Sequence, residues 1–152
     1  MYESVVIFFA QYFIALPVAV LVGYFFYTDR KKEFALLALG GLALTFVIGK
    51  GLGLLWYDPL PFVVGGFEPL FPHMVGNGFP SDHALFSASI AAMFWYFDKK
   101  ISVALFAVAL AIGEARVLAG VHHYVDIIGA VVVALFAVWA TRKILQRLRF
   151  FV

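Results

Sequence analysis

Residues 5–27 read VVIFFAQYFIALPVAVLVGYFFY and contain no Asp, Glu, Lys or Arg. A helix needs about 20 mainly apolar residues to cross the hydrocarbon core of a bilayer, and this stretch is long enough. No basic stretch precedes it and no small-residue cleavage site follows it, so the sequence predicts a retained transmembrane helix and not a signal peptide. The polar run TDRKKE at residues 28–33 ends it.

The composition of the 152-residue chain also indicates a membrane protein. It is 64% hydrophobic and 13% charged, with a mean hydropathy of +0.99, whereas soluble domains carry about 25% charged residues. So little polar surface favours a bilayer environment. The lack of cysteine excludes disulfides and thiolate metal sites. The net charge is only +2 and the basic residues are grouped by loop, so we expect no nucleic-acid partner.

Four further apolar segments follow, at residues 34–56, 83–97, 101–118 and 125–144. The connection 57–81 is rich in Gly and Pro, and residues 119–124 form a tight turn. These lengths predict an all-α integral membrane helical bundle with about five transmembrane helices. We expect residues 1–152 to form a single membrane-embedded domain.

The basic residues also predict an orientation. They follow the first, third and fifth segments, whereas the connections 57–81 and 119–124 contain no Lys or Arg. Lys and Arg mark the cytoplasmic side of short membrane loops. The sequence therefore predicts an N-terminus outside and a C-terminus inside a cell (plasma or inner) membrane.

Ionisable residues within membrane segments cost about 2.5–3.5 kcal/mol each at the helix centre, and they are usually functional. In this chain they are Lys50, His83, Glu114, Arg116, His122 and Asp126. Under the predicted orientation each lies near the outward end of its helix. This common level predicts one functional site on the extracytoplasmic side. A channel or proton-coupled carrier would need ionisable groups at several depths, so the pattern speaks against that class.

The spacing of these residues is typical of phosphoryl chemistry. His122 and Asp126 are four apart, so on a helix the carboxylate can hold one ring nitrogen and leave the other as nucleophile or base. Arg116 offers a planar fork that matches phosphate oxygens. Ser81 or Asp82 could cap a helix whose free N–H groups bind an anion.

His83 follows at that junction and could protonate a leaving oxygen. Each residue also has a purely structural interpretation. His122–Asp126 could be a structural hydrogen bond, and His83 a turn residue. Arg116 and Lys50 could reach water as interfacial anchors. We expect His73 and His123 at the wet surface and outside the chemistry.

Taken together, Pro80-Ser81-Asp82-His83, Arg116, His122 and Asp126 resemble the second and third signature motifs of the type 2 phosphatidic acid phosphatase superfamily. DPLPF at 58–62, LFPH at 70–73 and NGFPSDH at 77–83 resemble the bacitracin-resistance type of undecaprenyl-diphosphate phosphatase. The resemblance covers roughly residues 45–140. It implies a helical membrane bundle, catalysis without a metal or other cofactor, and a lipid phosphate or diphosphate substrate.

The resemblance also implies a role for each matching residue. His122 would attack phosphorus and form a phosphohistidine, with Asp126 orienting it. His83 would be the general acid for the leaving group and then activate water. Arg116 and the backbone near Ser81 would stabilise charge on the transferring phosphoryl group.

Three positions depart from the family pattern. Leu60 stands where the first motif has an arginine, Gly53 where a lysine is common, and Ala115 where a serine precedes the arginine of the third motif. Lys50 lies one helical turn before Gly53, so we hypothesise that it reaches the phosphate. Loss of a bidentate arginine could lower the rate by orders of magnitude.

The sequence thus predicts a lipid phosphatase that converts undecaprenyl diphosphate to undecaprenyl phosphate and phosphate. Phosphatidic acid, phosphatidylglycerophosphate or a lipid A phosphate is the alternative substrate. A non-catalytic membrane protein that binds lipid phosphates is the alternative from another class. The oligomeric state is left open.

Overall fold

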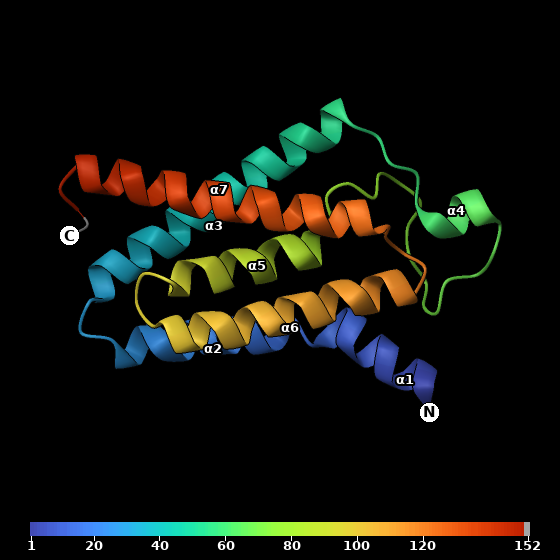
Figure 1. Ribbon diagram of the computed structural model, residues 1–152, viewed down its shortest axis with the longest axis horizontal. Helices are drawn as coiled ribbons and strands as arrows, with labels where there is room; N and C mark the ends of the chain where they lie inside the picture. The colour runs from blue at the N-terminus through green and yellow to red at the C-terminus, as the bar shows by residue number, and fades with distance from the viewer. Residues whose placement is uncertain (151–152) are drawn as a thin grey trace.

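The computed structural model describes residues 1–150, which form helices joined by short connections and one long one (Figure 1). The long helices are α2 (Ala15–Tyr27), α3 (Lys31–Leu55), α5 (Asp82–Phe94), α6 (Lys99–Leu118) and α7 (Tyr124–Arg147). They run alternately up and down the bundle, so the expected all-α membrane bundle is confirmed. By length and hydropathy, α3, α6 and α7 are able to span a membrane.

The first predicted segment is not one straight helix. It consists of α1 (Tyr2–Ile7), the π-helix η1 (Phe8–Tyr12) and α2, with a bend of 41° between the halves. Pro17 has no N–H to donate to the Phe13 carbonyl, which accepts from Leu16 N at 3.1 Å. A missing donor of this kind breaks or kinks a helix. Counted as one bent span, this pair raises the number of candidate spans to four.

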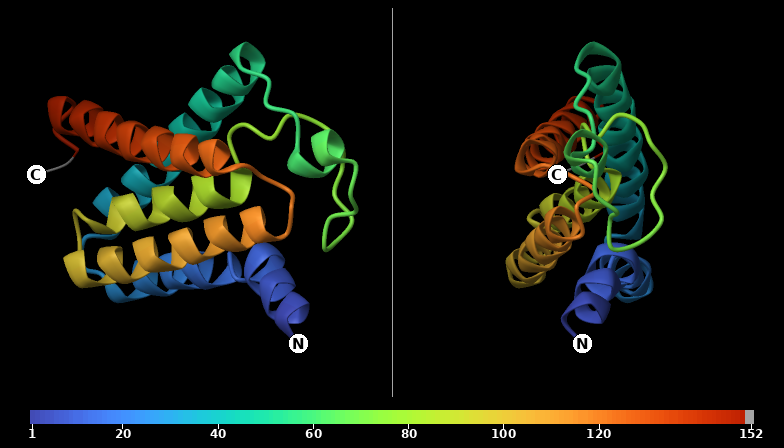
Figure 2. Two further views of the ribbon diagram at one scale, coloured as in Figure 1. Left: turned by 45° about the vertical axis from the view of Figure 1, so that its right-hand side comes forward. Right: turned by 90° about the vertical axis from the view of Figure 1, so that its right-hand side faces the viewer.

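The central helix is α5, and it is shorter than the predicted segment 83–97. Its 13 residues rise only about 20 Å, and ten of them are buried. Small residues, Ala and Ser, dominate its surface, which allows the close helix packing on which membrane bundles rely. Ser89 Oγ donates to Thr45 Oγ1 at 3.0 Å and thereby links α5 to α3. Thus α5 is a short helix enclosed by α3, α6 and α7 (Figure 2).

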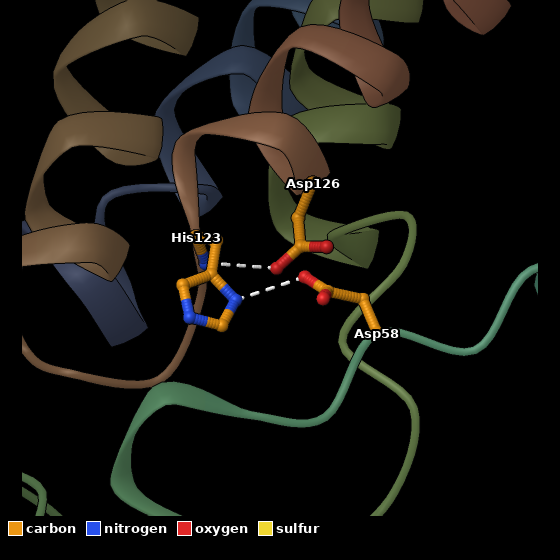
Figure 3. Close-up of side chains that lie close together, drawn as sticks. All are labelled: Asp58, His123 and Asp126. Carbon is orange, nitrogen blue, oxygen red and sulfur yellow. Dashed lines mark hydrogen bonds and ion pairs between the residues drawn. The ribbon is translucent and has the colours of Figure 1, made fainter. Parts of the chain in front are cut away.

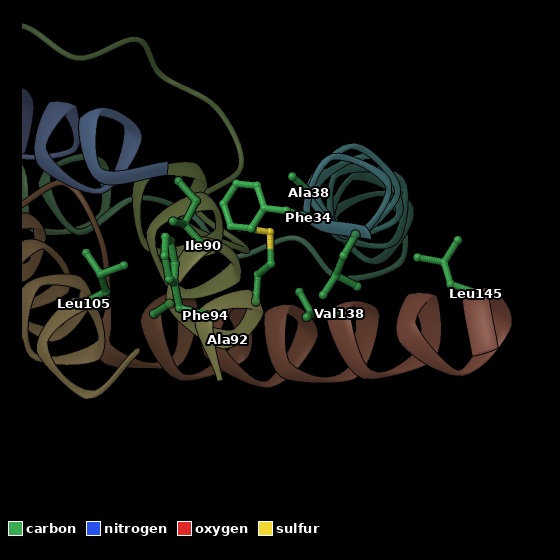
Figure 4. Packing of buried hydrophobic residues seen from close by; sticks show 11 residues of the cluster. Phe34, Ala38, Ile90, Ala92, Phe94, Leu105, Val138 and Leu145 are labelled. Atoms are coloured by element: carbon green, nitrogen blue, oxygen red, sulfur yellow. The ribbon is translucent and has the colours of Figure 1, made fainter. Parts of the chain in front are cut away.

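One end of the bundle holds a large apolar cluster and most of the basic residues. Phe34, Phe94, Leu105 and Val138 bring α3, α5, α6 and α7 together there (Figure 4). Nine of the eleven Lys and Arg residues lie in the helix ends on this side or just outside them: Arg30, Lys31, Lys32, Lys99, Lys100, Arg142, Lys143, Arg147 and Arg149. At the opposite end lie α1, the connection 56–81 and the turn before α7.

The long connection contains a short helix that the sequence interpretation left out. Helix α4 (Pro61–Gly65) begins with a proline at its first position and ends at Gly66, whose φ of 63° is left-handed. Proline is tolerated at the first helical position, and glycine adopts the left-handed conformation without steric cost. Asn77 then fastens the connection, because it donates to the carbonyls of Gly53 and Trp56 and accepts from the N–H groups of Asp58 and Phe79.

Candidate active site

A cavity of about 520 Å³ opens at the end of the bundle that carries the long connection. Its lining includes Lys50 from α3, His83 from α5, Arg116 from α6 and His122 from the turn before α7. These residues are far apart in the sequence but lie at the same end of the bundle, where α3 and α6 end and where α5 and α7 begin. Lys50 and Arg116 are the two basic residues that are absent from the basic end.

His122 and Asp126 are in contact, though not on one helix. Helix α7 begins at Tyr124, so His122 precedes it in an extended turn, contrary to the predicted helical pair. His122 Nδ1 lies 3.2 Å from Asp126 Oδ2, and both residues are buried. The same carboxylate oxygen accepts from His123 N at 2.8 Å and caps the helix. The cap therefore fixes the carboxylate that holds the His122 ring.

The contact with Arg116 determines which nitrogen of the His122 ring carries hydrogen. Its Nη2 lies 3.3 Å from His122 Nε2, and a guanidinium only donates hydrogen bonds. His122 Nε2 is therefore unprotonated, and Nδ1–H donates to Asp126. The nitrogen that faces the cavity carries a free electron pair, as a nucleophile requires.

Arg116 is buried without a carboxylate partner. Its exposed fraction is 4%. No carboxylate among residues 1–150 lies within salt-bridge distance of it, and Nε has no hydrogen-bond partner there. Nη1 donates to the Ala10 carbonyl in η1 at a long 3.4 Å. Because a buried charge is stabilised by an opposite charge, an anion beside His122 would give this guanidinium the partner that residues 1–150 do not provide.

The π-helix also contacts the second histidine of the cavity. The His83 ring lies near the backbone of Gln11, next to the Ala10 carbonyl that Arg116 reaches. In a π-helix the i→i+4 register is lost, and such turns are frequent at functional sites. The irregular N-terminal segment thus helps to position two residues that the sequence pattern singled out.

The remaining predicted residues occupy different places. Lys50 Nζ forms an ion pair with both carboxylate oxygens of Asp82. Ser81 is fully buried, does not line the cavity, and its Oγ has no partner among residues 1–150. Neither Ser81 nor Asp82 caps α5 with its side chain, contrary to the prediction. Glu114 lies outside the cavity and accepts from the Tyr124 hydroxyl at 3.0 Å.

The prediction for His73 was wrong. His73 is half-buried, lines the cavity, and its Nε2 lies 2.9 Å from Arg116 Nη2. It belongs to the irregular part of the connection, which has no periodicity from which the direction of its side chain could be predicted.

The position of Leu60, in contrast, explains its lack of a polar group. Its exposed fraction is 1%, and it is not among the cavity-lining residues.

Asp58, His123 and Asp126 form a second polar group beside the cavity (Figure 3). Each offers one ligand atom within 4.8 Å of the others, a spacing that could hold a metal ion. Those atoms are, however, already engaged. His123 Nδ1 donates to Asp58 Oδ2 at 2.8 Å, and Asp126 Oδ2 accepts from His122 and His123. A metal ion would have to replace the bond that orients His122.

Comparison with known proteins places these features in a family. The family model described as the PAP2 superfamily matches residues 34–150. Undecaprenyl-diphosphatase BcrC of Bacillus subtilis is 29% identical over 135 residues, which cover 88% of this chain and 69% of that protein. The bacitracin transport permease protein BcrC of Bacillus licheniformis is 29% identical over 150 residues, covering 95% and 74%.

Two solved structures share the fold. LpxE of Aquifex aeolicus has a TM-score of 0.74 and 23% identity, over 91% of this chain and 86% of that one. A PAP2-type phosphatidylglycerolphosphate phosphatase from Bacillus subtilis has a TM-score of 0.72 and 19% identity, over 96% and 77%. At these identities the structures support the fold alone. The resemblance in the sequence is confirmed by the family match, and this integral membrane protein belongs to the PAP2 superfamily of lipid phosphatases.

Proposed function

We propose that this chain hydrolyses a polyprenyl diphosphate, converting undecaprenyl diphosphate to undecaprenyl phosphate and inorganic phosphate. The observation that carries the proposal is the buried, carboxylate-free Arg116 next to the unprotonated Nε2 of His122. An anion-binding guanidinium adjacent to an oriented nucleophile is what phosphoryl transfer requires, because catalysis there rests on positioning and charge stabilisation.

In the first step, His122 Nε2 attacks the terminal phosphorus and the bond from phosphorus to the bridging oxygen breaks. Asp126 accepts from Nδ1–H and stabilises the positive charge that develops on the ring. Arg116 donates to the oxygens of the transferring phosphoryl group. The N-terminus of α5 lies at the same site and adds positive potential. Lys50 also lines the cavity and is paired with Asp82.

His83 is the proposed general acid. It lines the same cavity as His122 and donates a proton to the departing lipid phosphate oxygen. In the second step water attacks the phosphohistidine, His83 accepts its proton, and the bond between nitrogen and phosphorus breaks. Inorganic phosphate leaves and both histidines regain their resting state. No step uses a metal ion, so we propose metal-independent turnover.

A lipid substrate fits the surroundings of the cavity. An apolar hollow of about 420 Å³ between α3 and α7 is lined by residues that include Leu52, Trp56, Ile128 and Val132. Phe79 lines both this hollow and the polar cavity. The hollow can therefore hold the first part of a hydrocarbon tail while the phosphate lies at Arg116.

The choice of a diphosphate substrate rests on similarity in sequence. The Bacillus subtilis relative is named an undecaprenyl-diphosphatase, and the motifs at 58–62, 70–73 and 77–83 resemble that type. The cavity chemistry itself serves any lipid phosphate. Phosphatidic acid, phosphatidylglycerophosphate and lipid A phosphates are therefore the comparison substrates.

We also propose that the site faces the extracytoplasmic side. The cavity lies at the end opposite the nine clustered basic residues, and Lys and Arg accumulate in cytoplasmic loops. The substrate's phosphate would then be cleaved outside the cytoplasm, with the C-terminus inside.

The test is phosphate release by the purified protein in detergent with a chelator present. Undecaprenyl diphosphate is offered beside phosphatidic acid to wild-type protein and to His122→Ala. Glu114→Gln is the matched control, because Glu114 is an ionisable residue of the same bundle that lies outside the cavity. We expect chelator-resistant release, fastest with the diphosphate, that is lost only in His122→Ala. Lipid binding without any release would support the non-catalytic alternative.

A further inference from the structure

His73 has a defined protonation state in the resting site. Its Nδ1 lies 3.0 Å from the Met74 carbonyl, which only accepts, so Nδ1 carries hydrogen. Its Nε2 lies 2.9 Å from Arg116 Nη2, which only donates, so Nε2 is bare. The ring is therefore neutral. Burial is the main cause that lowers the pKa of His73. The bond to the Met74 backbone opposes it, and the nearby Arg116 and His122 lower the pKa further by smaller amounts.

Nη2, the Arg116 nitrogen nearest the nucleophile, is fully occupied while His73 remains in place, whereas Nε has no partner among residues 1–150. The two hydrogens of Nη2 go to His73 and to His122. A phosphoryl group that reaches His122 Nε2 must take these hydrogens, because Nη2 is the guanidinium nitrogen closest to the nucleophile. His73 then loses its donor, and its bare Nε2 would face a phosphate oxygen.

Two electron-rich atoms in contact repel each other, and a proton between them reverses the interaction. Such a proton matters because the cavity has few other cationic donors for a phosphate. The first motif has Leu60 in place of an arginine, and this residue is buried away from the cavity, so the motif contributes no cationic donor. Lys50 is paired with Asp82. Among the basic residues of the described chain, Arg116 is then the one guanidinium or ammonium in the cavity without a carboxylate partner.

The position of the His73 ring is set by its neighbours. Its centroid lies 6.2 Å from that of Phe62 and 6.3 Å from that of Phe71. The His122 ring stands nearly perpendicular to it, at 6.0 Å and 84°. These contacts keep His73 within reach of a phosphoryl group on His122. The same cavity contains five other charged or titratable groups: Lys50 from α3, Asp82 and His83 from α5, Arg116 from α6, and His122 from the turn before α7.

We propose that His73 is a phosphate ligand of this site. In the resting protein His73 Nε2 accepts a hydrogen bond from Arg116 Nη2. When a phosphate enters, Nε2 takes up one proton from solvent, and the resulting N–H donates a hydrogen bond to a phosphoryl oxygen. His73 thereby supplies a second cationic donor in a cavity to which Leu60, in place of the first-motif arginine, contributes none. The inference rests on the proposed phosphatase site for its substrate, but its direct ligand is the phosphate group, which permits a separate test.

The test is selective ¹⁵N labelling of histidine, of which the chain has four, followed by titration with inorganic phosphate in detergent micelles. Ring nitrogen shifts report the protonation of each histidine, and single His→Gln variants assign the signals. Without phosphate we expect His73 with a bare Nε2. With phosphate we expect a doubly protonated His73, while His123, which is bonded to Asp58 and outside the cavity, stays unchanged. A His73 that stays neutral throughout the titration overturns the inference.

Variants provide the second measurement. His73→Phe removes the donor, and it should weaken the inhibition of turnover by inorganic phosphate about tenfold, the effect of losing one charge-assisted hydrogen bond. His73→Gln retains a neutral donor and should lose less. Val75→Ala, an exposed residue of the same connection, is the control. Equal inhibition of His73→Phe and wild type contradicts the inference and leaves the phosphatase intact. A phosphate response of His73 without any turnover contradicts the proposed function alone.

Discussion

Lys50 and Asp82 form a bidentate ion pair at the rim of the cavity, with Nζ 2.9 Å from each carboxylate oxygen. Both side chains are about half exposed, and exposed ion pairs are worth little because solvent screens them. A phosphate that carries more charge than the carboxylate can therefore draw Lys50 away. The pair keeps the lysine beside the site without holding it strongly.

Asp82→Asn tests this relationship. The amide keeps the shape of the side chain but removes the charge that competes with phosphate for Lys50, so KM should fall about two- to fivefold with kcat nearly unchanged. Lys50→Ala should raise KM instead. Steady-state phosphate release measures both. A KM that rises in Asp82→Asn would show that the carboxylate assists binding and does not compete with it.

Leu60→Arg restores the residue of the family's first motif but should not restore its function. The leucine side chain is buried against Gly78 and does not line the cavity, so an arginine there places an unpaired charge in the packed connection. We expect a loss of about 2 kcal/mol or more in stability and no gain in turnover. Leu60→Met, which conserves volume, is the control in a thermal unfolding assay. Faster turnover at unchanged stability would contradict the packing argument.

Asn77 should be the main fastening of the long connection. Asn77→Ala removes two donated and two accepted hydrogen bonds, whereas Asn77→Asp keeps the accepted pair but sets a carboxylate oxygen against the Gly53 and Trp56 carbonyls. We expect faster proteolysis of residues 57–80 in both variants than in wild type, with about 1–3 kcal/mol lost in the alanine variant. Equal cleavage of all three proteins would mean that other contacts hold the connection.

The lack of cysteine makes the orientation directly measurable. Val75→Cys labels the connection beside the cavity, and Lys100→Cys labels the basic end. In intact cells a membrane-impermeant maleimide should modify Val75→Cys but reach Lys100→Cys only after permeabilisation. The reverse pattern would place the cavity on the cytoplasmic side.

The sequence predicted those parts of the structure that the bilayer constrains. Charges are costly in hydrocarbon, so the polar runs around residues 30 and 98 mark helix ends to within a few residues. The expected segments 34–56 and 101–118 correspond to α3 and α6. For the same reason the few ionisable residues within helices identified the level of the cavity.

Other features depended on tertiary contacts that a single sequence does not encode. Helix α5 is short because it is enclosed by its neighbours and need not reach both surfaces. The bend at residues 13–14 follows from Pro17, whose effect depends on the register of the preceding turn. His73 lines the cavity because the long connection folds back over it. The connection is irregular, so no sequence periodicity predicts its path. The motif around residues 70–73 was the one available signal for this residue.

Trapping the covalent intermediate tests the central claim most directly. Wild-type protein is mixed with undecaprenyl diphosphate that carries a radiolabelled terminal phosphate, quenched in alkali within the first turnover, and digested. Alkali preserves a bond between phosphorus and histidine nitrogen while the label's position is determined. The mechanism predicts label on the peptide that contains His122, and none in His122→Ala. Phosphate release at the normal rate with no labelled protein, or label on a different residue, would contradict nucleophilic attack by His122.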